Sequence, residues 1–195
     1  MDYHTFYVTF SGRVIPKMLL LLALFVHVNA FVRQNRYDVI HERMEAEYYD
    51  PTLSNLSCIN YKYNRTTRAF ILAVTFKNDL TERDTFLIMG YKWLSNRYRL
   101  DILQFNLTVK NAFRFRYFDL DRLMHSCTTP PAELPLIKGV TYTIRDWVPD
   151  STKFPPGIPE GRWKIAARLV TASGKHILSI NWYGAVKYKL RMESK

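Results

Sequence analysis

The sequence predicts an all-β protein built as a two-sheet antiparallel β-sandwich or cup. Several short stretches alternate apolar and polar residues with a period of two, which is typical of half-buried strands. Turn residues separate these stretches, among them Asn64-Arg-Thr-Thr67 and Ser173-Gly174-Lys175. No helix-periodic stretch is long enough to supply the crossovers that a parallel sheet needs. The chain has 195 residues, of which 48% are hydrophobic, and this is sufficient for one domain with a core.

Residues 1–30 are typical of a secretory signal peptide. Arg13 and Lys17 precede the apolar run Met18–Val26, and Val28-Asn29-Ala30 places small residues at the −3 and −1 positions of a cleavage site. The alternative is an uncleaved signal anchor, but His27 ends the apolar run well below the length that spans a bilayer. We therefore expect a secreted, extracellular protein whose mature chain begins near residue 31.

Two parts are expected after the signal peptide, an N-terminal segment at 31–57 and a β-cup domain at 58–195. The N-terminal segment is polar and mixed in charge. Its start is compatible with a short strand, whereas residues 39–47 include helix formers. The sequence of this segment is compatible with both a strand and a helix.

The first clear strands, 59–63 and 69–76, form a predicted hairpin. In the second strand Phe70, Leu72 and Val74 share one face, which we expect to be the inner one. The next stretch, 85–93, is apolar on both faces. Its single charged residue, Lys92, is expected to point to solvent. Because side chains alternate between the two faces of a strand, the residues expected to point inward are Leu87, Met89, Tyr91 and Trp93.

The stretch 98–109 changes the face of its apolar residues partway along. Leu100 and Ile102 share one parity, whereas Leu103 and Phe105 share the other. Because a slip of one residue turns every side chain to the opposite face, the switch predicts a β-bulge near Ile102 and Leu103. Phe105 then points inward, and Asn106 points to solvent.

Three stretches near the middle of the chain are less regular. Residues 110–126 fit either a continued strand or a short helix. Residues 128–138 and 146–161 are rich in proline and are predicted to be loops. Between those loops, 140–144 alternates as a strand.

Two C-terminal strands complete the predicted sandwich. In 163–169, Trp163 and Ile165 alternate with basic residues. In 178–190, Ile180 and Trp182 belong to the clearest alternation in the chain. The turn at 173–175 joins these strands as a hairpin.

The cysteines and sequons fit an exported protein. Cys58 and Cys127 are the only cysteines, and an oxidising compartment favours a disulfide between them, with two buried free thiols as the alternative. The sequence contains Asn-x-Ser/Thr sequons at Asn55, Asn64 and Asn106. Each predicts a solvent-facing asparagine if it is glycosylated.

The net charge is strongly basic, at +11, and removal of Asp2, Arg13 and Lys17 with the signal peptide would leave +10. In an exported protein this balance points to an anionic membrane surface, a glycan or a receptor rather than to nucleic acid. The basic residues are scattered among acidic ones, so a solvated surface is the simpler interpretation.

No catalytic motif is evident, and we expect neither an enzyme nor a cofactor or metal site. His41, His125 and His176 form no HExxH pair. A Cys127–His125 nucleophile is disfavoured by the expected disulfide. Asp119 and Asp121 could act as paired carboxylates, but a solvated loop is the simpler interpretation.

Several motifs resemble a secreted insect family, the CheB-type chemosensory proteins, which are similar to ganglioside-activator and other ML lipid-recognition proteins. The resemblance spans about residues 55–190, and its motifs are Cys58 with Asn64-Arg-Thr66, Cys127, Lys138-Gly-Val-Thr-Tyr-Thr-Ile144 and Phe154-Pro-Pro-Gly-Ile-Pro-Glu-Gly-Arg-Trp163. It implies an immunoglobulin-like β-cup of two sheets with an apolar ligand between them, and a role in chemical sensing. The chain has fewer cysteines than these relatives and a proline-rich insert before Gly139.

The sequence therefore predicts a secreted, non-enzymatic carrier or presenter of an apolar small molecule, either a lipid or a pheromone-like compound. The alternative is an interaction module with a filled core that acts through its basic face. Alternation alone does not distinguish a filled interior from a hollow one, because both need the same inward residues. The candidate pocket residues are Phe70, Leu72, Val74, Met89, Tyr91, Trp93, Phe105, Trp163, Ile165, Ile180 and Trp182.

Overall fold

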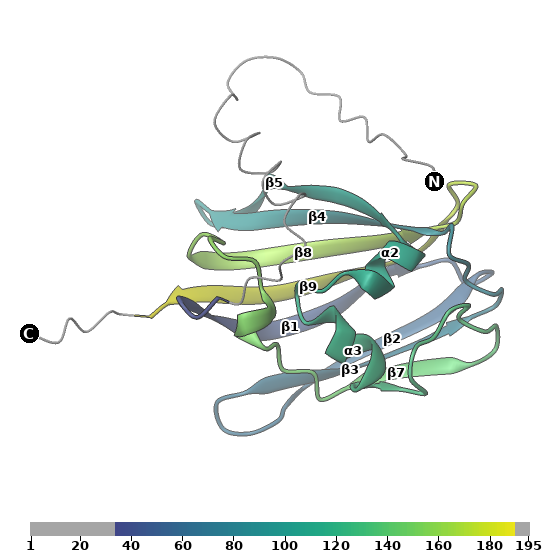
Figure 1. Cartoon of the computed structure of the whole chain (residues 1–195), viewed down its shortest axis with the longest axis horizontal. Helices are drawn as coiled ribbons and strands as arrows, with labels where there is room; N and C mark the ends of the chain where they lie inside the picture. The colour runs from purple at the N-terminus through teal and green to yellow at the C-terminus, as the bar shows by residue number, and fades with distance from the viewer. Residues whose placement is uncertain (1–33, 190–195) are drawn as a thin grey trace, which may run out of the picture. The chain divides into compact units, whose positions relative to one another are not determined.

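The computed structural model describes residues 34–189, and these form two antiparallel sheets (Figure 1). The predicted all-β sandwich is confirmed. Residues 1–33 and 190–195, and with them the expected signal peptide, lie outside the described residues. No helix among residues 34–189 is long and apolar enough to cross a membrane.

The larger sheet has five strands in the order β1-β9-β8-β4-β5. Their bounds are β1 Tyr37–Tyr49, β4 Thr85–Leu94, β5 Arg97–Thr108, β8 Gly161–Val170 and β9 His176–Tyr188. The smaller sheet has four strands in the order β2-β3-β7-β6. Their bounds are β2 Ser54–Lys62, β3 Arg68–Phe76, β6 Thr128–Thr129 and β7 Thr141–Arg145. The core lies between the two sheets.

The N-terminal segment 31–57 supplies β1 and the beginning of β2 to these sheets. The helix formers at 39–47 therefore lie in a strand, which corrects the helical alternative. Two register shifts of β1 against β9, at His41/Arg43 and Ala46/Tyr48, interrupt its alternation. These irregularities, together with the polar inward residue His41, hide the period of two in the sequence.

The predicted β-bulge in β5 is confirmed by its pairing with β4. Met89 pairs with Gln104 and Tyr91 pairs with Leu100, so β5 contains extra residues at this point. Gly90 faces the bulge, where an added Cβ would lie 2.7 Å from Cβ of Leu103. A glycine is therefore needed for Leu103 to turn toward the interior.

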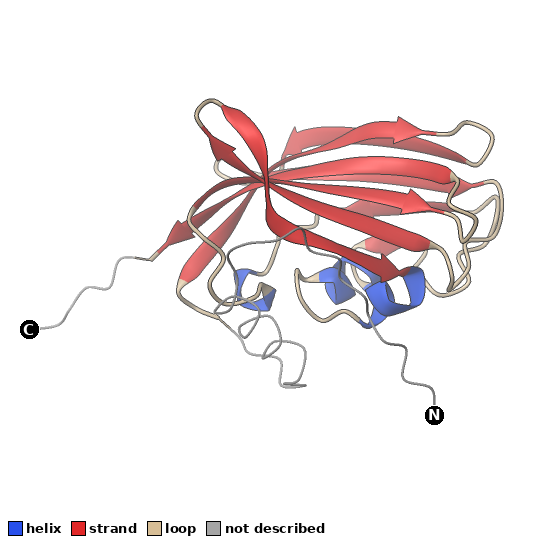
Figure 2. Ribbon diagram, turned by 90° about the horizontal axis from the view of Figure 1, so that it is seen from above, coloured by secondary structure: helices blue, strands red, loops and turns tan. Residues whose placement is uncertain are grey.

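Residues 110–126, which the sequence left open, contain two short helices. These are α2, Val109–Arg114, and α3, Leu120–His125. Thr108 caps α2, because its hydroxyl oxygen accepts a hydrogen bond of 3.3 Å from the backbone N–H of Asn111. The helices connect β5 to β6, the outer strands of the two sheets, and lie on the inner side of the strands (Figures 1 and 2).

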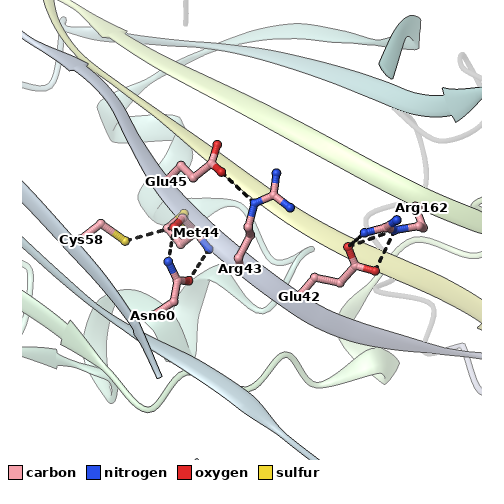
Figure 3. Close-up of polar contacts among 7 residues, drawn as sticks. All are labelled: Glu42, Arg43, Met44, Glu45, Cys58, Asn60 and Arg162. Atoms are coloured by element: carbon pink, nitrogen blue, oxygen red, sulfur yellow. Dashed lines mark hydrogen bonds and ion pairs between the residues drawn. The ribbon is translucent and has the colours of Figure 1, made fainter. Parts of the chain in front are cut away.

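The opposite pair of sheet edges, β1 and β2, is joined through side chains of β2 that bind the main chain of β1. Asn60 of β2 accepts a hydrogen bond of 2.7 Å from the backbone N–H of Met44 and donates one of 2.7 Å to its carbonyl oxygen (Figure 3). The thiol of Cys58 lies 3.4 Å from the same carbonyl oxygen. These contacts close the edge between the sheets at β1 and β2.

Candidate functional site

The space between the sheets contains a cavity of about 260 Å³. Its walls come from both sheets and from the segment that contains α2 and α3. Among the described residues the lining side chains are almost all aliphatic or aromatic, and none of them is charged. The hydroxyl of Thr128, which also lines the cavity, donates a 2.6 Å hydrogen bond to the carbonyl oxygen of Leu123. The cavity is therefore lined almost wholly by apolar side chains.

Aromatic residues from the helical segment form one wall of this cavity. Phe115 lies between Phe105 and Phe118, with ring centroids 6.0 Å and 6.1 Å apart. Phe113 and Met124 also line this wall. Phe105 was predicted inward, whereas Phe113, Phe115, Phe118 and Met124 were not, because residues 110–126 fitted both a strand and a helix. The spacing of the phenylalanines in Phe113-Arg-Phe-Arg-Tyr-Phe118 is a signal that could have indicated an apolar wall.

The helical wall is attached to the loop at 146–154 through Asp119. Its buried carboxylate accepts hydrogen bonds from Arg122, at 2.7 Å and 2.9 Å, and from the backbone N–H of Asp150, at 3.1 Å. Arg122 also donates to the carbonyl oxygen of Val148. Asp121, the other half of the candidate carboxylate pair, points to solvent and pairs with His125. The two carboxylates do not face one site.

Most of the predicted pocket residues lie at the interior. Six of them line the cavity: Leu72, Val74, Phe105, Ile165, Ile180 and Trp182. Phe70 and Trp163 are buried in the core beside it rather than in its lining. Trp163 donates a 3.0 Å hydrogen bond to the carbonyl oxygen of Pro159, which is in the proline-rich loop.

The assignment of Met89, Tyr91 and Trp93 to the interior is wrong. Phe86 and Ile88, of the opposite parity on β4, line the cavity, so these three residues and Leu87, which was also expected to point inward, lie on the outer face. The prediction was wrong because it placed Lys92 on the solvent face, whereas Lys92 has the same parity as the inward residues Phe86 and Ile88. Its ammonium reaches over the ring of Trp163 at the end of the strand, 5.8 Å from the centroid. A long side chain can thus keep an inward position and still place its charge at the rim.

The outer face of the five-stranded sheet combines aromatic and basic residues. Arg43 lies over the ring of Tyr183, at 3.8 Å from its centroid. Lys164 lies 4.2 Å from the ring centroid of Tyr91. Arg162 pairs with Glu42 at 2.8 Å (Figure 3). Much of the basic charge is therefore interspersed with rings and acidic groups.

Four rings form a cluster at one side of the cavity, and we call it the ring cluster: His41, Phe70, Trp147 and Trp182. The centroids of His41 and Phe70 are 5.2 Å apart, and those of Trp147 and Trp182 are 6.3 Å apart. The indole N–H of Trp182 donates a 3.0 Å hydrogen bond to Nδ1 of His41. Burial, with a contribution from Arg68, lowers the pKa of His41 to about 4, so the imidazole is neutral at pH 7.

Gly184 makes room for the ring of Trp182. A Cβ at this position would lie 2.5 Å from Cζ2 of Trp182 and 2.9 Å from the carbonyl oxygen of Ile40. We expect Gly184→Ala to lower the free energy of unfolding by about 1–3 kcal/mol, because either the ring or the β1 backbone has to move. Urea denaturation measures the loss. Unchanged stability and unchanged tryptophan fluorescence would show that Trp182 does not need this space.

The predicted disulfide is absent, because Cys58 and Cys127 are both free. Cys58 lies on β2, whereas Cys127 immediately precedes β6, and β3 and β7 separate these two edge strands. Both thiols pack against the cluster of Met44, Phe70 and Leu72. Burial raises the pKa of the Cys58 thiol to about 11 and also raises that of Cys127. They are therefore structural thiols with little thiolate character.

The sequon asparagines Asn55, Asn64 and Asn106 are all exposed. The oxygen of the Asn64 side chain accepts a 2.7 Å hydrogen bond from the backbone N–H of Thr67 within the β2–β3 turn. No group of three or more His, Cys, Asp or Glu side chains within residues 34–189 is arranged to hold a metal ion.

No family model and no curated protein matches the sequence at a significant level. Among solved structures, the chain is similar to a Niemann-Pick type C2 protein from the Japanese carpenter ant. That alignment has 10% identity and a TM-score of 0.35, and covers 72% of this chain and 96% of that one. The chain is also similar to chicken MD-1, solved in complex with lipid IVa, at 12% identity and a TM-score of 0.36. Here the alignment covers 82% of this chain and 96% of the other.

Proposed function

We propose that the protein is a non-enzymatic carrier that encloses one small apolar ligand between its sheets. The observation that carries this proposal is the cavity of about 260 Å³ with an uncharged, almost wholly apolar lining. Removing apolar surface from water is favourable, at about 0.8 kcal/mol for each buried CH₂ group. A preformed cavity supplies that gain with little reorganisation of the protein.

The cavity volume limits the size of the ligand. An engineered apolar cavity of about 150 Å³ binds benzene, so by proportion this chamber accommodates about ten non-hydrogen atoms. A medium-length alkyl compound or a small terpenoid meets this limit. A longer lipid would fit only with part of its chain outside.

Secretion and a role in chemical sensing belong to the same proposal. The leader-like residues 1–30 and the exposed sequons support an extracellular carrier, and volatile pheromone-like compounds fall within the proposed size. In this role the basic outer surface would bring the loaded protein to an anionic membrane or a receptor. An interaction module with a filled core is the less favoured function, because the interior is hollow.

Extraction and displacement test the carrier. Mass spectrometry of organic extracts of the purified protein should detect a co-purified apolar compound. A fluorescent apolar probe should bind and be displaced by compounds of about ten non-hydrogen atoms. Failure of both measurements on folded protein would contradict the carrier and favour the module, which predicts salt-sensitive binding to heparin-like polymers instead.

Filling the cavity should abolish binding and leave the fold intact. Ala167 of β8 lines the cavity and lies between Ile88 of β4 and Ile180 of β9. The variant Ala167→Phe places a ring in the chamber, and we expect probe affinity to fall at least tenfold. Ala172→Phe, at an exposed position after the same strand, is the matched control. If both variants bind the probe like the unmodified protein, the binding site lies elsewhere.

A further inference from the structure

The turn that joins β4 to β5 carries apolar side chains that the fold leaves exposed. We call residues 93–100 the hairpin tip. Trp93 and Leu94, at the end of β4, are 37% and 46% exposed, and Leu100 of β5 is 52% exposed. A group of exposed apolar residues with a polar rim is typical of an interaction surface.

The hairpin tip has a defined shape. Its turn residues Ser95 and Asn96 have φ angles of 51° and 63°, the left-handed conformation that tight two-residue hairpin turns use. Trp93 pairs with Tyr98, and their ring centroids are 4.8 Å apart. Tyr98 also contacts Tyr183 of β9, at 5.5 Å between centroids. The exposed side chains are therefore presented by a packed hairpin.

The charge of this hairpin is positive. Residues 85–100 contain Lys92, Arg97 and Arg99 and no acidic residue. Arg97 and Arg99 are exposed. The next acidic residue along β5 is Asp101. The tip thus places cations beside its apolar side chains.

The surroundings of the tip do not cancel this charge. The β2–β3 turn, which includes the exposed Arg65, lies at the same end of the sandwich as the β4–β5 turn (Figure 1). On the adjoining outer face Glu42 pairs with Arg162, and Glu45 pairs with Arg43. These carboxylates are already compensated, so the tip attracts anionic surfaces.

We propose that the hairpin tip docks the protein on an anionic lipid bilayer. Trp93, Leu94 and Leu100 enter the interfacial layer, where indole rings are favoured, and Arg97 and Arg99 contact the lipid phosphates. The inference rests on the proposed function, because it assigns the membrane contact of that carrier to one hairpin.

A bilayer fits the tip better than two other occupants. A second copy of the chain in a symmetric contact would bring the same cations together. An anionic glycan would pair with the arginines but leave Leu94 and Leu100 in water. A bilayer with anionic headgroups accommodates both kinds of side chain.

Co-sedimentation of the full chain with vesicles tests the docking. The protein should bind vesicles of equimolar phosphatidylcholine and phosphatidylserine, bind phosphatidylcholine alone more weakly, and dissociate in high salt, which screens the arginine–phosphate attraction. Brominated phosphatidylcholine in the mixed vesicles should quench the exposed Trp93, and Trp93→Phe should lose this quenching.

One pair of variants tests the apolar contribution. Leu94→Ser combined with Leu100→Ser should weaken binding to the mixed vesicles about tenfold or more, because less apolar surface leaves water. The matched control is Ile59→Ser combined with Ile137→Ser, whose side chains are 62% and 46% exposed outside the hairpin, and it should bind like the unmodified protein.

A second pair tests the charge. Arg97→Gln combined with Arg99→Gln should weaken binding about tenfold or more. Arg83→Gln combined with Lys175→Gln removes two exposed cations at the far end of β4 and at the β8–β9 turn, and should have little effect. Circular dichroism and urea denaturation show that each variant is folded.

The outcomes separate the docking from the proposed function. Hairpin variants that bind like their controls would overturn the docking, as would folded protein that ignores the mixed vesicles. Hairpin-dependent binding to heparin in place of vesicles, or a hairpin-dependent dimer, would also overturn it. Displacement of a fluorescent apolar probe reports on the cavity alone. Protein that binds the probe but not the vesicles keeps the carrier and loses the docking, whereas the converse overturns the carrier and keeps the docking.

Discussion

Phe70→Ala should lower the free energy of unfolding by about 3–5 kcal/mol. The Phe70 side chain is fully buried, with 0% exposure, and contacts rings on both sides. Its centroid lies 5.2 Å from that of His41 on β1 and 6.1 Å from that of Trp147. Removal of the ring therefore loses buried apolar surface and leaves a void where the two sheets meet.

Urea denaturation followed by circular dichroism measures this loss as a lower midpoint with an unchanged slope. Ile59→Ala, on the neighbouring strand β2, is the matched control, because Ile59 is 62% exposed and its loss should cost about 0.5 kcal/mol or less. A loss below about 1 kcal/mol for Phe70→Ala would contradict the central position of this ring.

The second large effect is a loss of stability in acid that depends on His41. Its pKa is lowered from 6.5 to about 4, first by burial and then by the nearby charge of Arg68, whereas Glu42 opposes the shift. Below pH 6.5 the unfolded chain takes up a proton that the folded protein refuses until about pH 4. Stability from the neutral imidazole is therefore complete above pH 6.5 and decreases as the pH falls, by about 3 kcal/mol in total.

The measurement compares stability at pH 7 and pH 4 in the unmodified protein and in His41→Gln, whose amide oxygen can accept the Trp182 hydrogen bond. The variant should lose up to about 3 kcal/mol less than the unmodified protein over this range. The pKa of His176 is also lowered, mainly by burial, so His176→Gln is the control and should retain the His41 contribution. Identical acid profiles for the unmodified protein and His41→Gln would contradict a neutral buried His41.

The sequence is informative where one face of a strand is apolar and the other polar. Leu72 of β3, Ile165 of β8 and Ile180 of β9 were predicted inward for this reason, and the structure places them in the cavity lining. Strand β4 is apolar on both faces, so its orientation depended on Lys92 alone, and that residue points inward at the rim. When both faces of a strand are apolar, the alternation of its residues does not show which face points to the interior.

Features that depend on distant contacts could not be predicted in this way. The register shifts in β1, Tyr37–Tyr49, interrupt the period of two that would have identified this strand in the sequence. The place of Phe115 in the cavity lining depends on how the helical segment packs between the sheets, which local sequence does not show. The disulfide was inferred from the expected compartment, whereas pairing of Cys58 with Cys127 depends on strand order. A filled and a hollow interior need the same inward residues, so the cavity itself has no signature in the pattern.

The sheets meet at two edges, one at β1 and β2 and one at the helical segment, and different contacts hold each edge together. At β1 and β2 the amide of Asn60 binds the main chain of Met44, so separation there disturbs the strand pairing itself. At the helical side the wall is held to the loop at 146–154 through the Asp119 carboxylate and through a 2.9 Å hydrogen bond from the backbone N–H of Phe118 to the carbonyl oxygen of Lys153. Separation there would break these contacts and leave the pairing of neighbouring strands intact. Opening at the helical side is therefore a local motion, which costs less free energy than unfolding of the whole domain.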